Sequence, residues 1–165
     1  EGMLMHHAQA LELSELVLAA SDVSDRVRAL AEFIVADQSA EIAVMTSWTD
    51  AWADASGAPA SAGHAAHGAA AEPVPASGGC TRDVHALMSG MATTEQLASL
   101  DAAEGAAAQR LFLELMIVHH EGALVMAEDA LVDGANAFVR SSAKHVIVEQ
   151  AREVAAMTDI LAETP

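Results

Sequence analysis

The chain has 165 residues, only 3% of them aromatic, and its 24 acidic and 7 basic side chains give a formal net charge of −17. This charge opposes binding to nucleic acids and anionic membranes and attracts cations, so we expect metal ions as partners and no nucleic acid. Ala, Leu and Met favour helices, and the aromatic residues that favour strands are scarce, so the composition predicts an all-α fold. No stretch has the length and apolar character of a membrane span.

Helical periodicity and capping signals predict four long helices, over residues 1–20, 24–54, 102–132 and 136–162. A short capped helix over residues 93–100 precedes the third of them. Residues 57–92 are rich in Ala, Gly, Pro and His and lack apolar periodicity, which predicts a flexible linker. We therefore expect one bundle domain, in which residues 1–56 form the first hairpin and residues 93–165 form the short helix and the second hairpin.

The two hairpins repeat each other in sequence. MLMHHAQALEL at residues 3–13 corresponds to MIVHHEGALVM at 116–126, and QSAEIAVM at 38–45 corresponds to QAREVAAM at 150–157. Matches of this length at a nearly constant offset indicate an internal duplication. Two such hairpins joined by a long crossover predict a four-helix bundle in which a pseudo-twofold axis places the two copies in equivalent environments.

Each copy carries two adjacent histidines among methionines, and helical spacing turns both histidines toward the bundle interior. The candidate metal ligands on these helices are Met3, His6 and His7 in the first copy and Met116, His119, His120 and Met126 in the second. The second helix of each copy presents one Glu and one Met on a single face: Glu41 and Met45, then Glu153 and Met157. Burying four imidazoles and two carboxylates costs free energy unless they are paired or hold a metal ion.

Ligand softness favours copper for this set. Imidazole with thioether suits Cu(I) or Ag(I), whereas imidazole with carboxylate suits iron, manganese or zinc, which remain alternatives. The di-iron pattern of helical bundles includes Glu-x-x-His, which occurs nowhere in the chain. Without a metal, the methionines would fill core gaps and the histidines would bond to the inward Gln and Glu side chains.

A possible secondary metal site lies near the end of the linker. His85, Met88 and Met91 in HALMSGM are soft ligands spaced three residues apart. The His-x-x-His pair of His64 and His67 carries less weight because such pairs in small-residue loops are often incidental. Cys80 is the lone cysteine, so it excludes an internal disulfide, and by itself it indicates little else.

At these residues the chain resembles the bacterial family called domain of unknown function 305. The family motif, approximately Met-Ile-x-His-His-x-x-Ala-x-x-Met-Ala, is present as MIVHHEGALVMA and less completely as MLMHHAQALELS. The resemblance implies a ferritin-like helical fold in exported proteins, some of which are associated with copper or silver handling outside the cytoplasm. We therefore expect a secreted, periplasmic or cell-surface protein whose export signal has been removed from this chain.

Three functions stay open from the sequence. The first is an extracytoplasmic protein that sequesters or passes on Cu(I) or Ag(I) through His and Met side chains, without a reaction of its own. The second is a ferritin-like enzyme that uses iron or manganese with Glu41 and Glu153, and the third is a structural bundle without metal. Leu13 stands where the second copy has Met126, so we expect the second copy to bind soft metals more tightly.

Overall fold

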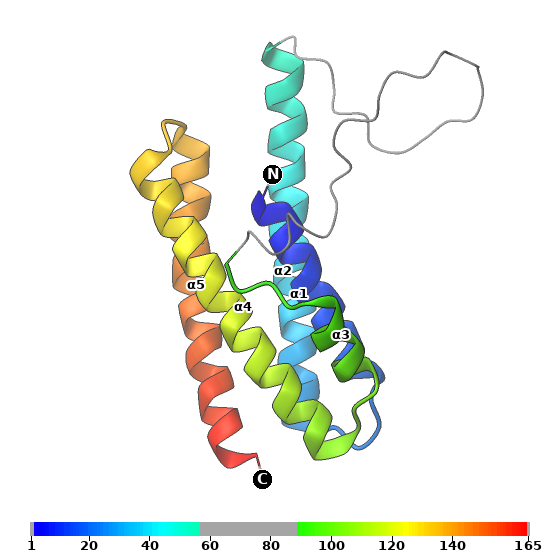
Figure 1. The fold of residues 1–165 in the computed structure, drawn as a ribbon. Helices are drawn as coiled ribbons and strands as arrows, with labels where there is room; N and C mark the ends of the chain where they lie inside the picture. The colour runs from blue at the N-terminus through cyan, green and yellow to red at the C-terminus, as the bar shows by residue number, and fades with distance from the viewer. Residues whose placement is uncertain (1, 57–88, 165) are drawn as a thin grey trace, which may run out of the picture.

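The computed structural model describes residues 2–56 and 89–164, which form five helices and no strand. The helices are α1 (Gly2–Ala19), α2 (Asp25–Ser56), α3 (Thr94–Asp101), α4 (Gly105–Asp133) and α5 (Ala137–Glu163). Figure 1 shows two antiparallel hairpins side by side, α1 with α2 and α4 with α5. The prediction of an all-α fold with four long helices and one short helix is confirmed. The predicted linker, except for residues 89–92, lies outside the described residues.

The helix ends form where the sequence signals them. The Asn136 side chain begins α5 by accepting hydrogen bonds from the backbone N–H groups of Phe138 and Val139. Thr93 and Gln96 form a reciprocal capping box at the start of α3. These side chains satisfy N–H groups that have no acceptor within the helix, so the local sequence specifies where α3 and α5 start. Glu104 at the start of α4 makes no such side-chain cap.

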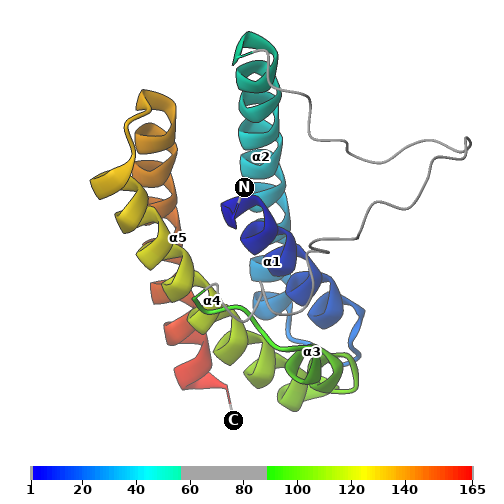
Figure 2. The same cartoon turned by 45° about the horizontal axis from the view of Figure 1, so that its top comes forward.

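The two hairpins meet through α1 and α4, and α3 packs against both of these helices. The start of α4 is tied to the turn of the first hairpin, where the Gly105 N–H donates to the Ser21 carbonyl oxygen at 2.9 Å. At the other end, Figures 1 and 2 both show α2 diverging from the α4–α5 hairpin. None of the helices in the described ranges combines the length and apolar character needed to cross a membrane.

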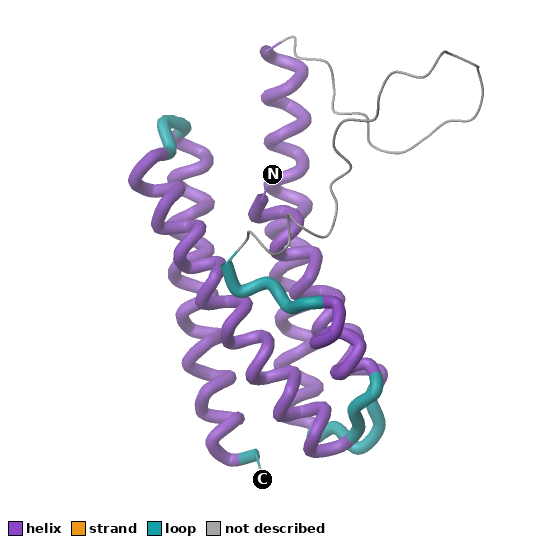
Figure 3. The backbone as a smooth tube through the Cα atoms, in the orientation of Figure 1, coloured by secondary structure: helices purple, strands orange, loops and turns teal. Residues whose placement is uncertain are grey.

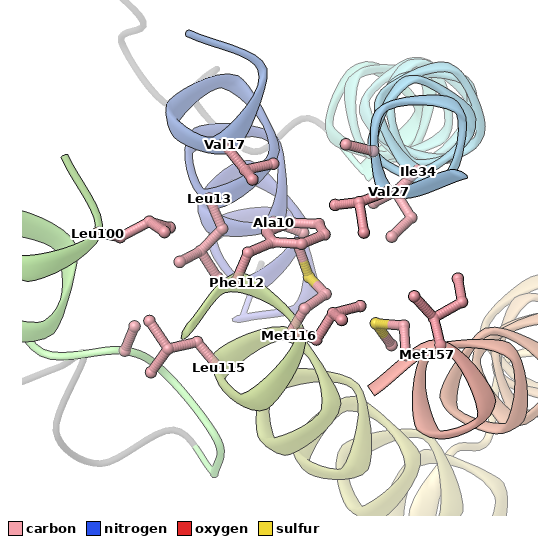
Figure 4. Close-up of a cluster of buried hydrophobic side chains, with 14 residues drawn as sticks. Ala10, Leu13, Val17, Val27, Ile34, Leu100, Phe112, Leu115, Met116 and Met157 are labelled. Atoms are coloured by element: carbon pink, nitrogen blue, oxygen red, sulfur yellow. The ribbon is translucent and has the colours of Figure 1, made fainter. Parts of the chain in front are cut away.

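The core divides into a cluster of large side chains and a cluster of small ones. The large cluster includes Leu13, Ile34 and Phe112, which are fully buried, and Figure 4 shows its side chains converging from several helices. Burying each of these side chains stabilises the fold by roughly 1.5–3 kcal/mol. The small cluster consists of Ala123, Ala127, Ala143 and Val146. Small side chains fill less space, and the cavities described below lie at this end of the bundle.

Candidate metal site

Four buried histidines meet at the contact between α1 and α4. His6 and His7 lie on α1, His119 and His120 lie on α4, and none of the four is exposed to solvent. The ring centroids of His6 and His119 are 3.8 Å apart, and those of His119 and His120 are 6.1 Å apart. The prediction that all four side chains face the bundle interior is confirmed. We call these four residues the histidine cluster.

One histidine of each pair contacts a buried glutamate within its own hairpin. Nε2 of His7 lies 2.7 Å from Oε2 of Glu41, and Nε2 of His120 lies 2.5 Å from Oε2 of Glu153. The two glutamates are only 8% and 5% exposed. Burying an unpaired carboxylate costs several kcal/mol, so the histidine contacts are what allow these acids inside the bundle. The structure thus pairs each of the two predicted glutamates with a predicted histidine of its own hairpin.

Within residues 2–56 and 89–164, five ring nitrogens of the histidine cluster have no partner with hydrogen-bond geometry. They are Nδ1 of His6, His7 and His120, together with both nitrogens of His119. A ring nitrogen that carries no proton has a lone pair, which can bind a metal ion. Each buried polar atom without a partner costs about 1–3 kcal/mol, so this arrangement is a poor way to stabilise a bundle. It suits a site that binds a ligand.

Burial lowers the pKa of two histidines in the cluster. The pKa of His6 falls from 6.5 to about 4 because burial disfavours the imidazolium; the Ser89 carbonyl opposes this shift, and the charges of His7 and His120 add to it. Burial also holds the pKa of His119 well below its usual value, and the charges of His6, His120 and His7 act in the same direction, whereas a contact with the His6 backbone opposes the shift. Both rings are therefore neutral at pH 7, which is the form that binds metal ions.

Residues 89–92, which we call the crossing segment, run as a loop from α4 to α1 on the way to α3 (Figure 3). The Ser89 carbonyl oxygen accepts a hydrogen bond from Nε2 of His6 at 3.0 Å. The Gln9 side chain binds the backbone of Ala92 twice: its Nε2 donates to the carbonyl at 2.9 Å, and its Oε1 accepts from the N–H at 2.7 Å. These bonds fix the crossing segment against α1 beside the first histidine pair.

Two glycines allow the crossing segment to approach α4 closely. Gly90 has a φ of +81°, a conformation that favours glycine. A Cβ atom on Gly122 would lie 1.9 Å from the Ser89 carbonyl oxygen, and one on Gly90 would lie 2.3 Å from the Val118 carbonyl oxygen. In the sequence repeat Gln9 stands where the second copy has Gly122. The two copies thus differ at the position that contacts the crossing segment, which the sequence analysis did not identify.

The methionines predicted as ligands are distributed over different parts of the bundle. Met116 and Met157 are fully buried in the large cluster, as Figure 4 shows, and Met116 lies one helical turn before the histidine pair of α4. Met3 packs against the small cluster. Met45 lines the cavities between α2 and α5. Met126 is half-buried. Met116 is therefore the buried thioether nearest to a histidine pair along its helix.

The possible secondary metal site stays a prediction, because His85 and Met88 lie outside the described residues. His64, His67 and Cys80 lie outside them as well. Met91 is half-buried in the crossing segment. Within residues 2–56 and 89–164, no group of three or more His, Cys, Asp or Glu side chains is arranged to hold a metal ion. A protein site for zinc supplies at least three such ligands, whereas a soft ion also accepts thioether sulfur.

His145 and Asp37 lie next to Glu41 and were missed by the sequence analysis. Nε2 of His145 is 3.5 Å from Oε1 of Glu41, and all three residues line a cavity of about 310 Å³ between α2 and α5. Burial, followed by the charges of Glu41, Glu153 and Glu149, raises the pKa of Asp37, and His145 opposes this shift. A spacing of four residues places Asp37 on the same helical face as Glu41, and it places His145 on the same helical face as Glu149 and Glu153. That periodicity could have identified Asp37 and His145 from the sequence.

Two solved structures share the fold at substantial sequence identity. The chain is 32% identical to a DUF305 fragment from Deinococcus radiodurans, with a TM-score of 0.73 over 98% of this chain and 91% of that chain. It is 28% identical to a DUF305 protein from Streptomyces coelicolor, with a TM-score of 0.75 over 98% of this chain and 87% of that chain. The arrangement of helices is therefore one already observed in experimental structures.

The chain also resembles CopM in its Cu(I)-bound form, with 23% identity and a TM-score of 0.67 over 98% of this chain and 91% of that chain. The Ag-bound and Cu(II)-bound forms of CopM give TM-scores of 0.65 and 0.69 at 22% and 21% identity. At these identities the similarity shows a shared fold. No curated protein matches the chain. The family model described as Domain of unknown function (DUF305) matches residues 1–161, and the chain therefore belongs to the DUF305 family.

Proposed function

We propose that the protein binds Cu(I) or Ag(I) at the histidine cluster, and that it sequesters or passes on the ion without catalysing a reaction. The observation that carries this proposal is the set of five buried ring nitrogens without a partner. His6 and His119 are neutral at pH 7, so a cation would meet lone pairs there without displacing protons. CopM, which has the same fold, has been solved with Cu(I) and with Ag, and this supports the choice of metal.

The residues take different roles in this proposal. His6 and His119 are the principal ligands, because their rings are closest and come from different hairpins. Met116 is the first thioether candidate, since it is buried one turn before His119 on the same helix. The remaining candidate thioethers are Met3, Met45, Met126 and Met157. Cu(I) accepts imidazole and thioether together, which are the donors that this part of the bundle offers.

The surroundings also support handling of a cation outside the cytoplasm. The net charge of −17 raises the local concentration of cations around the protein. Thioether ligands remain usable where thiols oxidise, although methionine itself can form a sulfoxide. The Streptomyces coelicolor relative is described as a candidate secreted protein, which supports an extracytoplasmic location.

An anaerobic competition titration against a chromophoric Cu(I) chelator tests the proposal. His119→Leu is the informative variant, because neither ring nitrogen has a partner and Leu replaces the ring without leaving a polar atom unpaired. We expect its Cu(I) affinity to fall by about tenfold or more, a loss of at least ~1.4 kcal/mol in binding free energy. Val118→Leu is the control, since the Val118 side chain lies exposed on the same helix, next to His119.

Two results would count against the proposal. If His119→Leu competes for Cu(I) as well as the wild-type protein, the histidine cluster is not the site. If protein purified without a histidine tag contains iron or manganese and binds no Cu(I), the enzyme hypothesis with Glu41 and Glu153 takes its place.

A further inference from the structure

We infer that His6, His7 and His120 offer Nδ1 as their metal-binding atom, and that the Ser89 carbonyl, Glu41 and Glu153 impose this by accepting the proton on Nε2. The metal part of this inference rests on the proposed function. The proton positions are a property of the metal-free protein and stand independently of it. Glu41 and Glu153 are then positioning residues that act through histidine and do not touch the metal ion.

His6 gives the most direct argument. Its Nε2 lies 3.0 Å from the Ser89 carbonyl oxygen, and a carbonyl oxygen can only accept a hydrogen bond. Nε2 therefore carries a proton. A neutral imidazole has one protonated nitrogen, so the lone pair resides on Nδ1, which is buried and has no partner among the described residues.

His7 and His120 repeat this arrangement with carboxylates. The distances from Nε2 to the glutamate oxygens are 2.7 Å for His7 and 2.5 Å for His120. A carboxylate without a proton can only accept, and we infer that each Nε2 is the donor of its pair. In each ring Nδ1 is the atom without a partner among the described residues. The same assignment arises in both hairpins from pairs that occupy corresponding positions of the sequence repeat.

His119 differs from the other three. Within the described residues neither of its nitrogens has a partner with hydrogen-bond geometry, although its ring lies 3.8 Å from that of His6 and the His6 backbone is close enough to affect its pKa. No well-formed hydrogen bond in this part of the chain selects one nitrogen of His119 over the other. The cluster therefore combines three rings whose binding atom is set in advance with one ring that can bind through either nitrogen.

The glutamates contribute orientation and basicity. A carboxylate that accepts the proton of one ring nitrogen holds the ring in place and makes the other nitrogen a stronger donor to a metal ion. The Ser89 carbonyl, the acceptor of His6, is also held in place. Gly122 allows Ser89 to approach α4, and Gln9 binds both the N–H and the carbonyl oxygen of Ala92. The crossing segment and the two glutamates thus perform the same task for three different rings.

Nitrogen-15 NMR on the full chain with labelled histidine tests the inference first without metal. Long-range proton–nitrogen correlations distinguish the nitrogen that carries a proton from the one that does not, and single His substitutions assign the rings. We expect Nε2–H with an unprotonated Nδ1 for the three rings at pH 7.5. A proton on Nδ1 of neutral His6, or Nε2 acting as the acceptor in either glutamate pair, would overturn the inference.

Addition of Ag(I), which is diamagnetic, then identifies the binding atom. We expect the Nδ1 resonances of the cluster to move with Ag(I), while the Nε2 protons of His6, His7 and His120 persist. Loss of those Nε2 protons on binding would contradict the assignment. If Ag(I) causes no change at all, the proposed function fails, and the metal-free spectra still decide where the protons lie.

Variants of Glu41 separate positioning from a general structural role. Glu41→Gln keeps an oxygen that accepts from His7, whereas Glu41→Leu removes it; Glu32→Leu, an exposed position on the same helix, is the control. We expect slow solvent exchange of the His7 Nε2 proton in Glu41→Gln and fast exchange in Glu41→Leu. Ag(I) affinity should fall by about 10- to 100-fold only in Glu41→Leu. An equal loss of Ag(I) affinity in both variants would show that Glu41 binds the metal ion directly and overturn its positioning role. If Glu41→Leu does not fold, unchanged Ag(I) affinity in Glu41→Gln still supports the role of Glu41 in positioning His7.

Discussion

The rings of His6 and His119 lie with their centroids 3.8 Å apart, at the contact between α1 and α4. The two residues occupy corresponding positions of the sequence repeat, so the duplicated motif meets its own copy in the interior of the bundle. Burial and the neighbouring histidine charges lower both pKa values. Two adjacent imidazoles are thereby kept neutral. Because a neutral imidazole keeps a lone pair, both rings remain able to bind a metal ion.

The free energy of unfolding should decrease as the pH falls from about 6.5 to about 4. Unfolded His6 takes up a proton near pH 6.5, while folded His6 does so only near pH 4, so the unfolded state binds more protons in this window. At about 1.36 kcal/mol per pKa unit, the lowered pKa of His6 changes the free energy of unfolding by about 3 kcal/mol across this window. The stability is highest above pH 6.5 and is lost as the pH falls toward 4. His119 acts in the same direction. Urea denaturation of the metal-free protein across this pH range measures the change.

Two variants connect this pH dependence to the cluster. His119→Leu should reduce the slope, because one of the two groups with a lowered pKa is removed. Val118→Leu, at the exposed position next to His119, should leave the slope unchanged because it removes no titratable group. A pH dependence that is the same in wild type and in His119→Leu would contradict the low pKa of His119.

The metal-free His119→Leu variant should be more stable than the wild-type protein. His119 is fully buried and both of its ring nitrogens lack a partner, so replacing the ring removes two unsatisfied polar atoms. We expect a gain of about 1–2 kcal/mol at pH 7.5, in the range of the penalty for such atoms. Urea denaturation measures it, together with the Cu(I) titration described above. A loss of stability in this variant would show that His119 is retained for packing.

Substitution of Gly122 should displace the crossing segment. A Cβ atom at this position would lie 1.9 Å from the Ser89 carbonyl oxygen, which is backbone and has little freedom to move aside. We expect Gly122→Ala to lower stability by about 1–3 kcal/mol, although Ala favours helix more than Gly does. The Nε2 proton of His6 should then exchange faster with solvent. Glu121→Ala, at the exposed neighbouring position, is the control, and equal effects of both substitutions would refute the close approach.

Methionine substitutions should separate ligands from core residues. Leu has nearly the volume of Met, so Met116→Leu and Met157→Leu should each change stability by less than about 1.5 kcal/mol. We expect Met116→Leu to lower Cu(I) affinity about tenfold, because a soft ligand is lost. Half-buried Met126 should have a smaller effect. Anaerobic Cu(I) titration of the three variants measures this, and equal affinities throughout would restrict the site to histidine.

The sequence by itself determined the helices, the starts of α3 and α5, and the inward direction of both histidine pairs. These features depend on residues that are close along the chain: the Asn136 and Thr93 caps bind backbone groups two or three residues away, and a period of 3.6 residues decides which side chains share a face. The same periodicity placed Glu41 and Glu153 on inward faces. Local physical chemistry was sufficient because each of these interactions closes within a single helix or turn.

Only the tertiary structure decided which of these groups meet. His6 lies against His119 from the other hairpin while His7 pairs with Glu41, Ser89 reaches His6 from the crossing segment, and the methionines are divided among separate parts of the core. Such contacts depend on how the two hairpins pack and on the close approach of Ser89 to Gly122. The periodicity of a single helix shows which face is buried but not which atoms on another helix it will contact. The ring nitrogens left without a partner, on which the proposed function rests, are a consequence of that packing alone.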